Sequence, residues 1–149
     1  MLPAPIPVNE KKRLEALRSY GILDSDAYAC MQPLTKIAAD ICDCPKSTIS
    51  LIDKNRVWFY TKVGLGEETK EVPRDISVCA HVLLYQQTMI IPDTLKDNRF
   101  SDNLFVLEDL SIRFYAGVPL INKDGFILGT LCVFDQVPGE PFSETNLVT

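Results

Sequence analysis

The sequence predicts an α+β domain built on a central antiparallel sheet of about five to six strands. Two observations carry this prediction. Apolar residues recur at helical spacing between residues 10 and 41, and the period then changes to the two-residue alternation of strands. Strand-like segments are also joined in pairs by short polar turns, which is typical of antiparallel hairpins.

The first expected helix covers residues 9–21. Leu14 and Leu17 fall on one face, Asn9 can cap the start, and Gly21 supplies a left-handed stop. The segment is therefore predicted to be helical up to that glycine.

A second helix is expected because Leu34, Ile37, Ala38 and Ile41 recur at helical spacing. Pro33 marks its first turn, since a proline deeper inside a helix costs about 3 kcal/mol. The helix is thus predicted to begin next to that proline.

The later segments alternate strands with loops and short helices. In chain order they are a hairpin (47–53 and 56–63, turning at Lys54 and Asn55), a loop (64–75), a short helix capped by Ser77 (77–87), a brief strand (88–91), a long polar connection (93–111) and a second hairpin (112–120 and 125–135, turning near Asp124 and Gly125). In the last strand two largely apolar faces alternate, with Phe126, Leu128, Thr130, Cys132 and Phe134 on one and Ile127, Leu131 and Val133 on the other. That strand is therefore expected to be central and covered on both sides.

Composition and charge restrict the class of protein. With 149 residues, 46% of them hydrophobic and 23% charged, the chain has the size and balance of one soluble globular domain. A net charge of −5 argues against binding to nucleic acid, and no apolar run approaches the roughly 18 residues that insert into a membrane. Five cysteines without a secretory signal predict reduced thiols and a cytoplasmic location. The prolines in residues 1–9 predict an extended lead-in to a single domain over residues 10–149.

Six sequence blocks connect the chain to a known family. They are "ALRSYGILDS", "ISLIDKNRVWFYTKVGL", "VPRDISVCAH", "IIPDTLKDNRFSDN", "IRFYAGVPL" and "GTLCVFD". In order and spacing they resemble bacterial GAF domains, especially the N-terminal sensor modules of histidine kinases and diguanylate cyclases. The resemblance extends from about Glu10 to Phe142.

The resemblance implies a GAF/profilin-like architecture and a regulatory, non-catalytic role. The terminal helices would pack on one face of the sheet, and mid-chain helices and loops would cover a pocket for an unknown small molecule on the other. Such modules commonly form homodimers through their terminal helices and pass a signal to a C-terminal output domain. A C-terminal helix that begins near Ser143 and is cut short fits such a module.

Departures from the family pattern argue against several ligands and cofactors that GAF domains are known to bind. The Asn-Lys-Phe-Asp-Glu signature of cyclic-nucleotide-binding GAF domains is absent, and Leu104 stands where many relatives carry proline. Bilin-carrying relatives have a cysteine followed directly by histidine, whereas Ala80 separates Cys79 from His81, so a covalent bilin is not expected. The two thiols of "CDC" at 42–44 have no second pair, so no metal site is expected. The cofactor is left unknown.

Nine residues are candidates for ligand binding, and none is a candidate catalyst. They are Phe59, Cys79, His81, Asp93, Arg99, Phe100, Arg113, Tyr115 and Thr130. Trp58 and Phe59 point to opposite faces of their strand, so only one of them can line a pocket, and strand aromatics are commonly core residues. The charged residues of the long connection either contact the ligand or solvate the loop and cap short helices.

Cys79 and His81 each allow two interpretations. Cys79 falls in the first turn after Ser77, where backbone N–H groups stabilise a thiolate, but a free cysteine also behaves as a small buried hydrophobe. His81 either lines the pocket or hydrogen-bonds to the neighbouring loop as a structural residue.

Arg113 lies inside a strand-like run, on the same face as Tyr115 and Gly117. An unpaired buried charge costs several kcal/mol, so an arginine on a covered face needs a partner. That partner is either an aspartate of the segment 92–103 or the carboxylate or phosphate of a ligand. The sequence leaves both open.

Two other functions compete with the sensor interpretation. A small redox enzyme, or a thiol redox sensor, of the free-methionine-sulfoxide reductase type would need several cysteines converging on one pocket. A pure dimerisation module would have an empty pocket.

Overall fold

The structure, a computed structural model, describes residues 3–25, 31–102 and 111–139. Its strands form one antiparallel sheet of six in the order β3-β2-β1-β6-β5-β4. The strands are β1 (Lys46–Ile52), β2 (Arg56–Val63), β3 (Glu71–Pro73), β4 (Met89–Ile91), β5 (Phe114–Ile121) and β6 (Ile127–Asp135). The helices are α1 (Glu10–Ser19), α2 (Gln32–Ile41) and the short 3₁₀ helices η1 (Arg74–Ile76), η2 (Cys79–Leu84) and η3 (Thr94–Lys96). The predicted α+β class and the central antiparallel sheet are confirmed.

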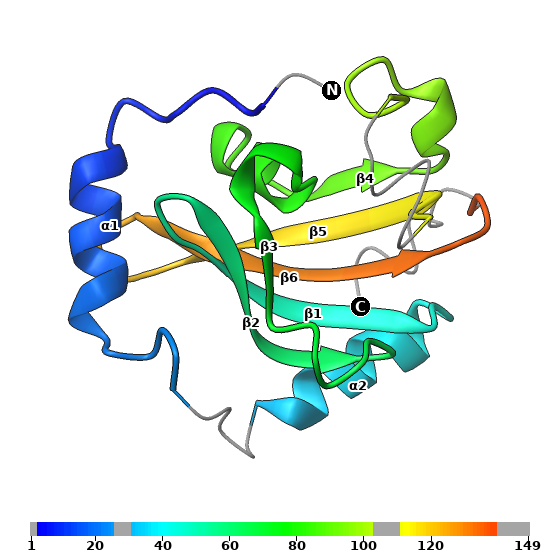
Figure 1. Cartoon of the computed structure of the whole chain (residues 1–149), viewed down its shortest axis with the longest axis horizontal. Helices are drawn as coiled ribbons and strands as arrows, with labels where there is room; N and C mark the ends of the chain where they lie inside the picture. The colour runs from blue at the N-terminus through cyan, green and yellow to red at the C-terminus, as the bar shows by residue number, and fades with distance from the viewer. Residues whose placement is uncertain (1–2, 26–30, 103–110, 140–149) are drawn as a thin grey trace.

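The sheet lies between two layers (Figure 1). Helix α2 packs on one face, against β1 and β2, while η1 and η2 lie over the other face, with η2 against β5 and β6. Helix α1 crosses the end of the strands beside β6. We call residues 74–84, which are η1, η2 and the link between them, the roof.

Apolar side chains fill the space on both sides of the sheet. The cluster on the roof side includes Val57, Val82, Ile91, Phe100 and Tyr115. The clusters on the α2 side include Leu51, Trp58, Tyr60, Phe114 and Val133. Trp58 and Phe59 therefore point to opposite faces, as predicted, and Phe59 is the one that packs on the roof side.

Strand β6 is central, as predicted, because it pairs with β1 on one side and β5 on the other. Cys132 and Phe134 face the roof, whereas Val133 faces α2. The prediction is wrong at the start of the strand, where Ile127 lies on the roof side and Leu128 on the α2 side. The β5–β6 register shifts at Leu120/Ile121, opposite this point, and an irregular register changes which face a side chain points to.

Helix α1 agrees with the prediction except at its cap. Leu14 and Leu17 are buried, and Gly21 has a φ of 63°, the left-handed conformation expected of the stop. The Asn9 side chain, however, makes no capping hydrogen bond. The carboxylate of Glu10, in the first turn, is instead bound by arginines, as described below.

Helix α2 begins next to Pro33, as predicted, but its largest apolar side chains do not face the sheet. Leu34, Ile37 and Ile41 are 48%, 52% and 68% exposed. The buried positions are Thr35 and Ala39. Small side chains on the sheet-facing side let the helix lie close to β1 and β2, and the apolar stripe is left on the surface.

The middle of the chain contains more regular structure than the sequence predicts. The expected loop 64–75 contains edge strand β3 and the start of η1, and the helix expected over 77–87 is shorter, a 3₁₀ helix over Cys79–Leu84. The predicted cap is wrong in position: the N-cap of η2 is Val78, which makes no side-chain capping bond. Ser77 lies one residue earlier, and its Oγ accepts a hydrogen bond from the Cys79 backbone N–H at 3.2 Å. Helix η3 supplies the short helix of the long connection. Leu104 and the helix predicted from residue 143 lie outside the described residues.

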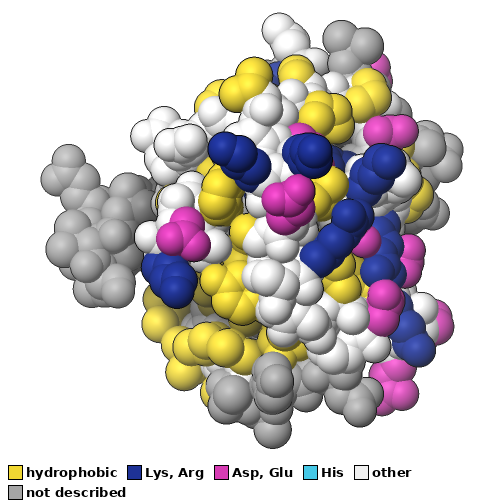
Figure 2. All heavy atoms as spheres, turned by 90° about the vertical axis from the view of Figure 1, so that its left-hand side faces the viewer, with side chains coloured by type: hydrophobic (Ala, Val, Ile, Leu, Met, Phe, Trp, Pro, Cys, Tyr) yellow, Lys and Arg dark blue, Asp and Glu magenta, His cyan; other side chains and the backbone are white. Residues whose placement is uncertain are grey.

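The surface around α1 carries charges of both signs. Figure 2 shows Lys and Arg side chains alternating with Asp and Glu on this face, so it presents no uniformly basic surface. Among the helices of the described chain, none combines the length and the hydropathy that a membrane span requires.

Candidate functional site

Two cysteine side chains meet beneath the roof. Cys79, the first residue of η2, and Cys132, in the middle of β6, lie with their Sγ atoms 3.9 Å apart. They are 8% and 1% exposed. A roof residue and a central strand residue thus form a buried thiol pair between the two layers.

Hydroxyl groups from neighbouring strands surround the pair. The Tyr115 hydroxyl of β5 donates to Cys79 Sγ at 3.3 Å. Thr48 Oγ1 of β1 is hydrogen-bonded to Cys132 Sγ at 3.0 Å and to Ser50 Oγ at 2.7 Å. We call these five residues the thiol cluster. Its polar atoms are satisfied largely by one another, inside an otherwise apolar core.

Thr130 belongs to the same surroundings. It is fully buried in β6, and its hydroxyl lies beside the Cys79 sulfur. It thus adds another polar atom on the sheet side of Cys79.

The cluster gives its two thiols different acidities. The pKa of Cys79 is lowered from 9.0 to about 6, because hydrogen bonds from Cys132 and from the Tyr115 hydroxyl outweigh the desolvation that burial imposes. The pKa of Cys132 is raised well above its ordinary value, since Cys132 donates to Cys79 and is itself buried. The arrangement therefore favours the thiolate on Cys79 and the proton on Cys132.

A cavity of about 30 Å³ adjoins the cluster. Its lining includes Thr48, Phe59, Ser77, Cys79 and Tyr115. A water molecule needs roughly 10–15 Å³, so this volume holds one very small molecule. A nucleotide-sized ligand could enter only if the roof moved away from the sheet.

A wider groove lies outside the roof, with a volume of about 540 Å³. Its lining residues are Pro3, Pro5, His81, Leu84, Tyr85, Asn98, Arg99 and Asp102. Arg99 donates to both carboxylate oxygens of Asp97, at 2.8 and 3.0 Å, and to the Tyr85 hydroxyl at 3.0 Å. The charge of Arg99 is therefore already neutralised within the protein.

His81 lines the groove but is mostly a core residue. It is 6% exposed, and its ring lies edge-on to that of Phe100, with the centroids 4.8 Å apart. Burial lowers the pKa of His81, which keeps the imidazole neutral at pH 7. Phe100 itself is fully buried beside it.

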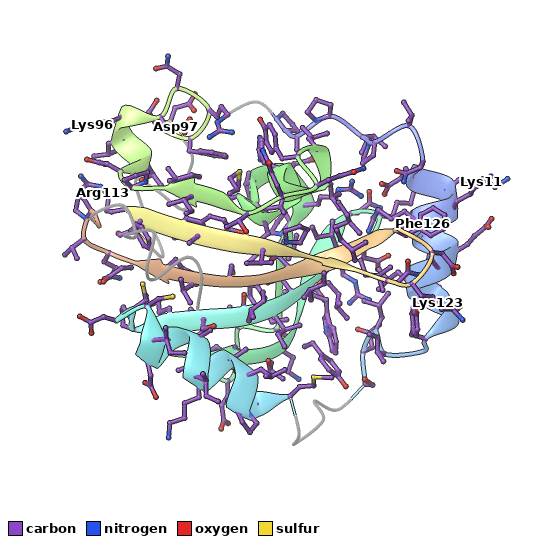
Figure 3. The ribbon with its side chains drawn as sticks, turned by 180° about the vertical axis from the view of Figure 1, so that it is seen from behind. Lys11, Lys96, Asp97, Arg113, Lys123 and Phe126 are labelled. Atoms are coloured by element: carbon purple, nitrogen blue, oxygen red, sulfur yellow. The ribbon has the colours of Figure 1, made fainter. Side chains whose placement is uncertain are left out.

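Arg113 is not inside a buried strand, contrary to the expectation from the sequence. Strand β5 begins one residue later, and Figure 3 shows Arg113 at the end of the sheet far from α1, close to Lys96 and Asp97 of the η3 region. Its side chain is 30% exposed and its Nη2 lies 3.5 Å from Asp93 Oδ1. Asp93 also accepts a hydrogen bond from the Leu95 N–H. The internal ion pair is thus present, while the ligand contact stays a prediction.

The nine candidate residues therefore separate into three places. Four of them, Phe59, Cys79, Tyr115 and Thr130, meet beneath the roof. His81 and Arg99 line the outer groove and both contact the ring of buried Phe100. Asp93 and Arg113 form the ion pair at the end of the sheet. Cys132, Thr48 and Ser50 were missed. The spacing of 48 with 50 and of 130 with 132, on single strand faces, is the signal that could have found them.

A buried ion-pair network joins α1 to the roof. Glu10 accepts hydrogen bonds from Arg13 at 3.0 and 3.1 Å and from Arg74 of η1 at 2.5 and 3.2 Å. The side chains of Arg13 and Arg74 are 1% and 5% exposed. Arg13 also donates to the carbonyl oxygen of Ile127 in β6, at 3.2 Å. We call Glu10, Arg13 and Arg74 the α1–roof clamp.

Metal ligation has little basis in these residues. Across the ranges 3–25, 31–102 and 111–139, no group of three or more His, Cys, Asp or Glu side chains is placed to hold a metal ion. The thiol cluster contributes two sulfur atoms and hydroxyl groups only.

Comparison with known proteins assigns the family. A sequence model described as "GAF domain" matches residues 26–148. The chain belongs to the GAF domain family. Over 147 residues this GAF domain is 33% identical to a cyclic di-GMP phosphodiesterase of Pseudomonas aeruginosa, a match that covers 99% of the chain and 25% of the relative. The chain thus spans a quarter of the length of that relative.

Solved structures share the fold. The GAF domain of a phosphoenolpyruvate-protein phosphotransferase from Acinetobacter has a TM-score of 0.64 at 20% identity, covering 92% of this chain and 84% of that one. A type II free methionine-R-sulfoxide reductase from Thermoplasma acidophilum has a TM-score of 0.62 at 12% identity, covering 89% and 85%. At such identities the likeness extends to the fold alone.

Proposed function

We propose that this GAF domain is a non-catalytic regulatory module that senses a small signal and controls a catalytic domain of a longer signalling protein. The observation that carries the proposal is the alignment along nearly the whole chain with only a quarter of a cyclic di-GMP phosphodiesterase. In a protein of that length, the three quarters outside the matched segment are large enough to hold a catalytic domain. Turnover of cyclic di-GMP is therefore our first choice for the output, with the histidine kinase output suggested by the sequence as the other.

The α1–roof clamp offers a path for the signal. A molecule or modification beneath the roof that favours one position of η1 acts on Arg74, and Arg74 shares the Glu10 carboxylate with Arg13. The signal must bind or form more favourably in one arrangement of α1 than in the other, because only such a difference shifts a population. Helix α1 would then transmit the change toward the output domain.

We further propose that the module works as a homodimer. The sequence suggests terminal helices as the interface, and the exposed stripe of Leu34, Ile37 and Ile41 on α2 adds a second surface. Three large apolar side chains in line on one helix are an unusual surface for a monomer. A second copy of the chain would bury them.

A domain exchange tests the regulatory role. The quarter of the Pseudomonas phosphodiesterase that aligns with this chain is replaced by the chain, and hydrolysis of cyclic di-GMP is measured. A regulatory module makes hydrolysis depend on the clamp, so Glu10→Gln changes the rate while Glu15→Gln, at an exposed position of α1, does not. Equal rates for both variants, the unsubstituted chimera and an enzyme lacking the segment would contradict the proposal.

A further inference from the structure

The thiol pair differs from Cys42 and Cys44, the other two cysteines within the described residues. Cys42 and Cys44 are half-buried at the end of α2, and burial raises the pKa of Cys44 to about 12. Cys79 instead lies 3.9 Å from a second sulfur and receives a hydrogen bond from Tyr115. Two sulfur atoms that touch across two layers of a core, with a proton donor on one of them, form a reactive arrangement.

We propose that Cys79 and Cys132 are a modification site that hydrogen peroxide oxidises to an intramolecular disulfide. Cys79 is the attacking thiol, because the Tyr115 hydroxyl donates a hydrogen bond to its sulfur and so stabilises a thiolate. Cys132, which is hydrogen-bonded to Thr48, is the resolving thiol. This chemistry goes beyond the proposed function and stands without it. Only the idea that the disulfide is the signal that controls the catalytic domain rests on the proposed function.

The cavity beside Cys79 selects the oxidant. Its volume of about 30 Å³ holds a molecule with two oxygen atoms but excludes an aromatic hydroperoxide. Ser77, Thr48 and Tyr115 are among its lining residues, so three hydroxyl-bearing side chains lie beside the space that a peroxide would occupy. Hydrogen peroxide thus fits where bulkier oxidants do not.

The oxidation balances without another reactant. The Cys79 thiolate attacks one peroxide oxygen, the O–O bond breaks, and the products are a sulfenic acid on Cys79 and hydroxide. The hydroxide takes the proton of Cys132 and becomes water. The Cys132 thiolate then attacks the Cys79 sulfur, the S–S bond forms, the S–O bond breaks, and the second hydroxide leaves and becomes water with the proton that Cys79 had given up. Two thiols lose two electrons, and one peroxide becomes two waters.

The disulfide must move the roof. An S–S bond is about 2.05 Å long, so the two sulfur atoms must approach by about 1.9 Å from their separation of 3.9 Å. Strand β6 is held between two neighbours, and the 3₁₀ turn of η2 is held by fewer contacts. We therefore expect the roof to move toward β6 when the disulfide forms. Arg74 is the first residue of the roof, so the movement reaches the α1–roof clamp.

The decisive experiment uses the full chain with Cys30, Cys42 and Cys44 changed to serine, so that only the pair remains. Hydrogen peroxide is added, and thiols are counted after denaturation while peptide mapping without reductant locates the bond. The expected result is the loss of both thiols and one peptide that joins Cys79 to Cys132. Persistence of both thiols under peroxide that oxidises free cysteine in the same solution would overturn the proposal.

Single variants assign the roles. With Cys132→Ser the reaction stops at a sulfenic acid on Cys79, which a dimedone adduct reports, and with Cys79→Ser no adduct forms on Cys132. Tyr115→Phe slows the reaction severalfold at pH 7 and moves the midpoint of its pH profile upward. Cumene hydroperoxide reacts more slowly than hydrogen peroxide. An adduct on Cys132 alone, or equal rates for the two oxidants, contradicts the assigned roles.

This test is independent of the domain exchange. A disulfide in the isolated chain together with an unregulated chimera refutes the sensor function and leaves the modification site. Regulated hydrolysis without a disulfide supports the sensor function and refutes the modification site.

Discussion

Replacing Glu10 by glutamine should destabilise the protein through the α1–roof clamp. Burial alone would raise the pKa of Glu10, but hydrogen bonds from Arg74 and Arg13 outweigh it and lower the pKa from 4.5 to about 2. The difference between these two pKa values corresponds to at most about 3.4 kcal/mol of stability. Because Glu10 keeps some exposure to solvent, we expect a loss of about 2–3 kcal/mol at pH 7. The variant leaves two buried guanidinium groups without their carboxylate.

The sign of the pH dependence follows from the lowered pKa. The folded state binds the Glu10 proton more weakly than the unfolded state does, so the contribution is complete above about pH 4.5 and is lost as the pH falls toward 2. With these two pKa values, about 2 kcal/mol of the upper limit is lost by pH 3. The difference between wild type and Glu10→Gln should therefore shrink as the solution is acidified.

Urea unfolding at several values between pH 7 and pH 3 measures this difference. Glu15→Gln serves as the matched control, because Glu15 is an exposed carboxylate of the same helix, and it should change the free energy of unfolding by less than about 0.5 kcal/mol. A gap between wild type and Glu10→Gln that stays constant with pH, or is no larger than that of the control, would refute the reasoning.

Three other substitutions test separate parts of the structure. Gly129→Ala should lower the free energy of unfolding by at least about 1–3 kcal/mol in urea melts, since a Cβ there overlaps the backbone oxygen of Ser50; a neutral result would contradict this close approach of β6 to β1. Ile37→Glu should convert a dimer to a monomer in light scattering without loss of stability, and an unchanged mass would exclude the α2 stripe as the interface. Arg113→Ala should cost less than about 1 kcal/mol, because its pair with Asp93 is partly exposed; a much larger loss in the same melts would mean that Arg113 holds the fold together.

The order of elements could be predicted because its signals are local. The change from helical to strand period, and turns such as the one with Gly125 at a φ of 87°, involve residues close in sequence. The side of α2 that packs could not be predicted in this way. Periodicity defines a stripe of Leu34, Ile37 and Ile41, but whether the sheet covers it depends on neighbours distant in sequence.

The candidate site was harder to predict for the same reason. Cys79 could be singled out from its place after Ser77, but its partner Cys132 lies 53 positions away. Arg74 and Glu10 are 64 positions apart, and nothing in the local pattern of either reveals the other. The alternation in residues 112–120 predicts a strand that includes Arg113, whereas the strand begins one residue later.

The clamp also bears on where this domain can be cut. A fragment that begins at residue 26, where the family match begins, lacks α1 and the carboxylate of Glu10. The side chain of Arg74 is 5% exposed, and it also donates to the backbone oxygens of Asp53 and Lys54, at 3.0 and 3.4 Å. These neutral oxygens would remain as its partners in such a fragment. A buried cation without its counterion favours local unfolding, so η1 would loosen from the sheet. We therefore expect the first helix to be part of the folding unit, and a fragment that begins at residue 26 to be less stable than the whole chain.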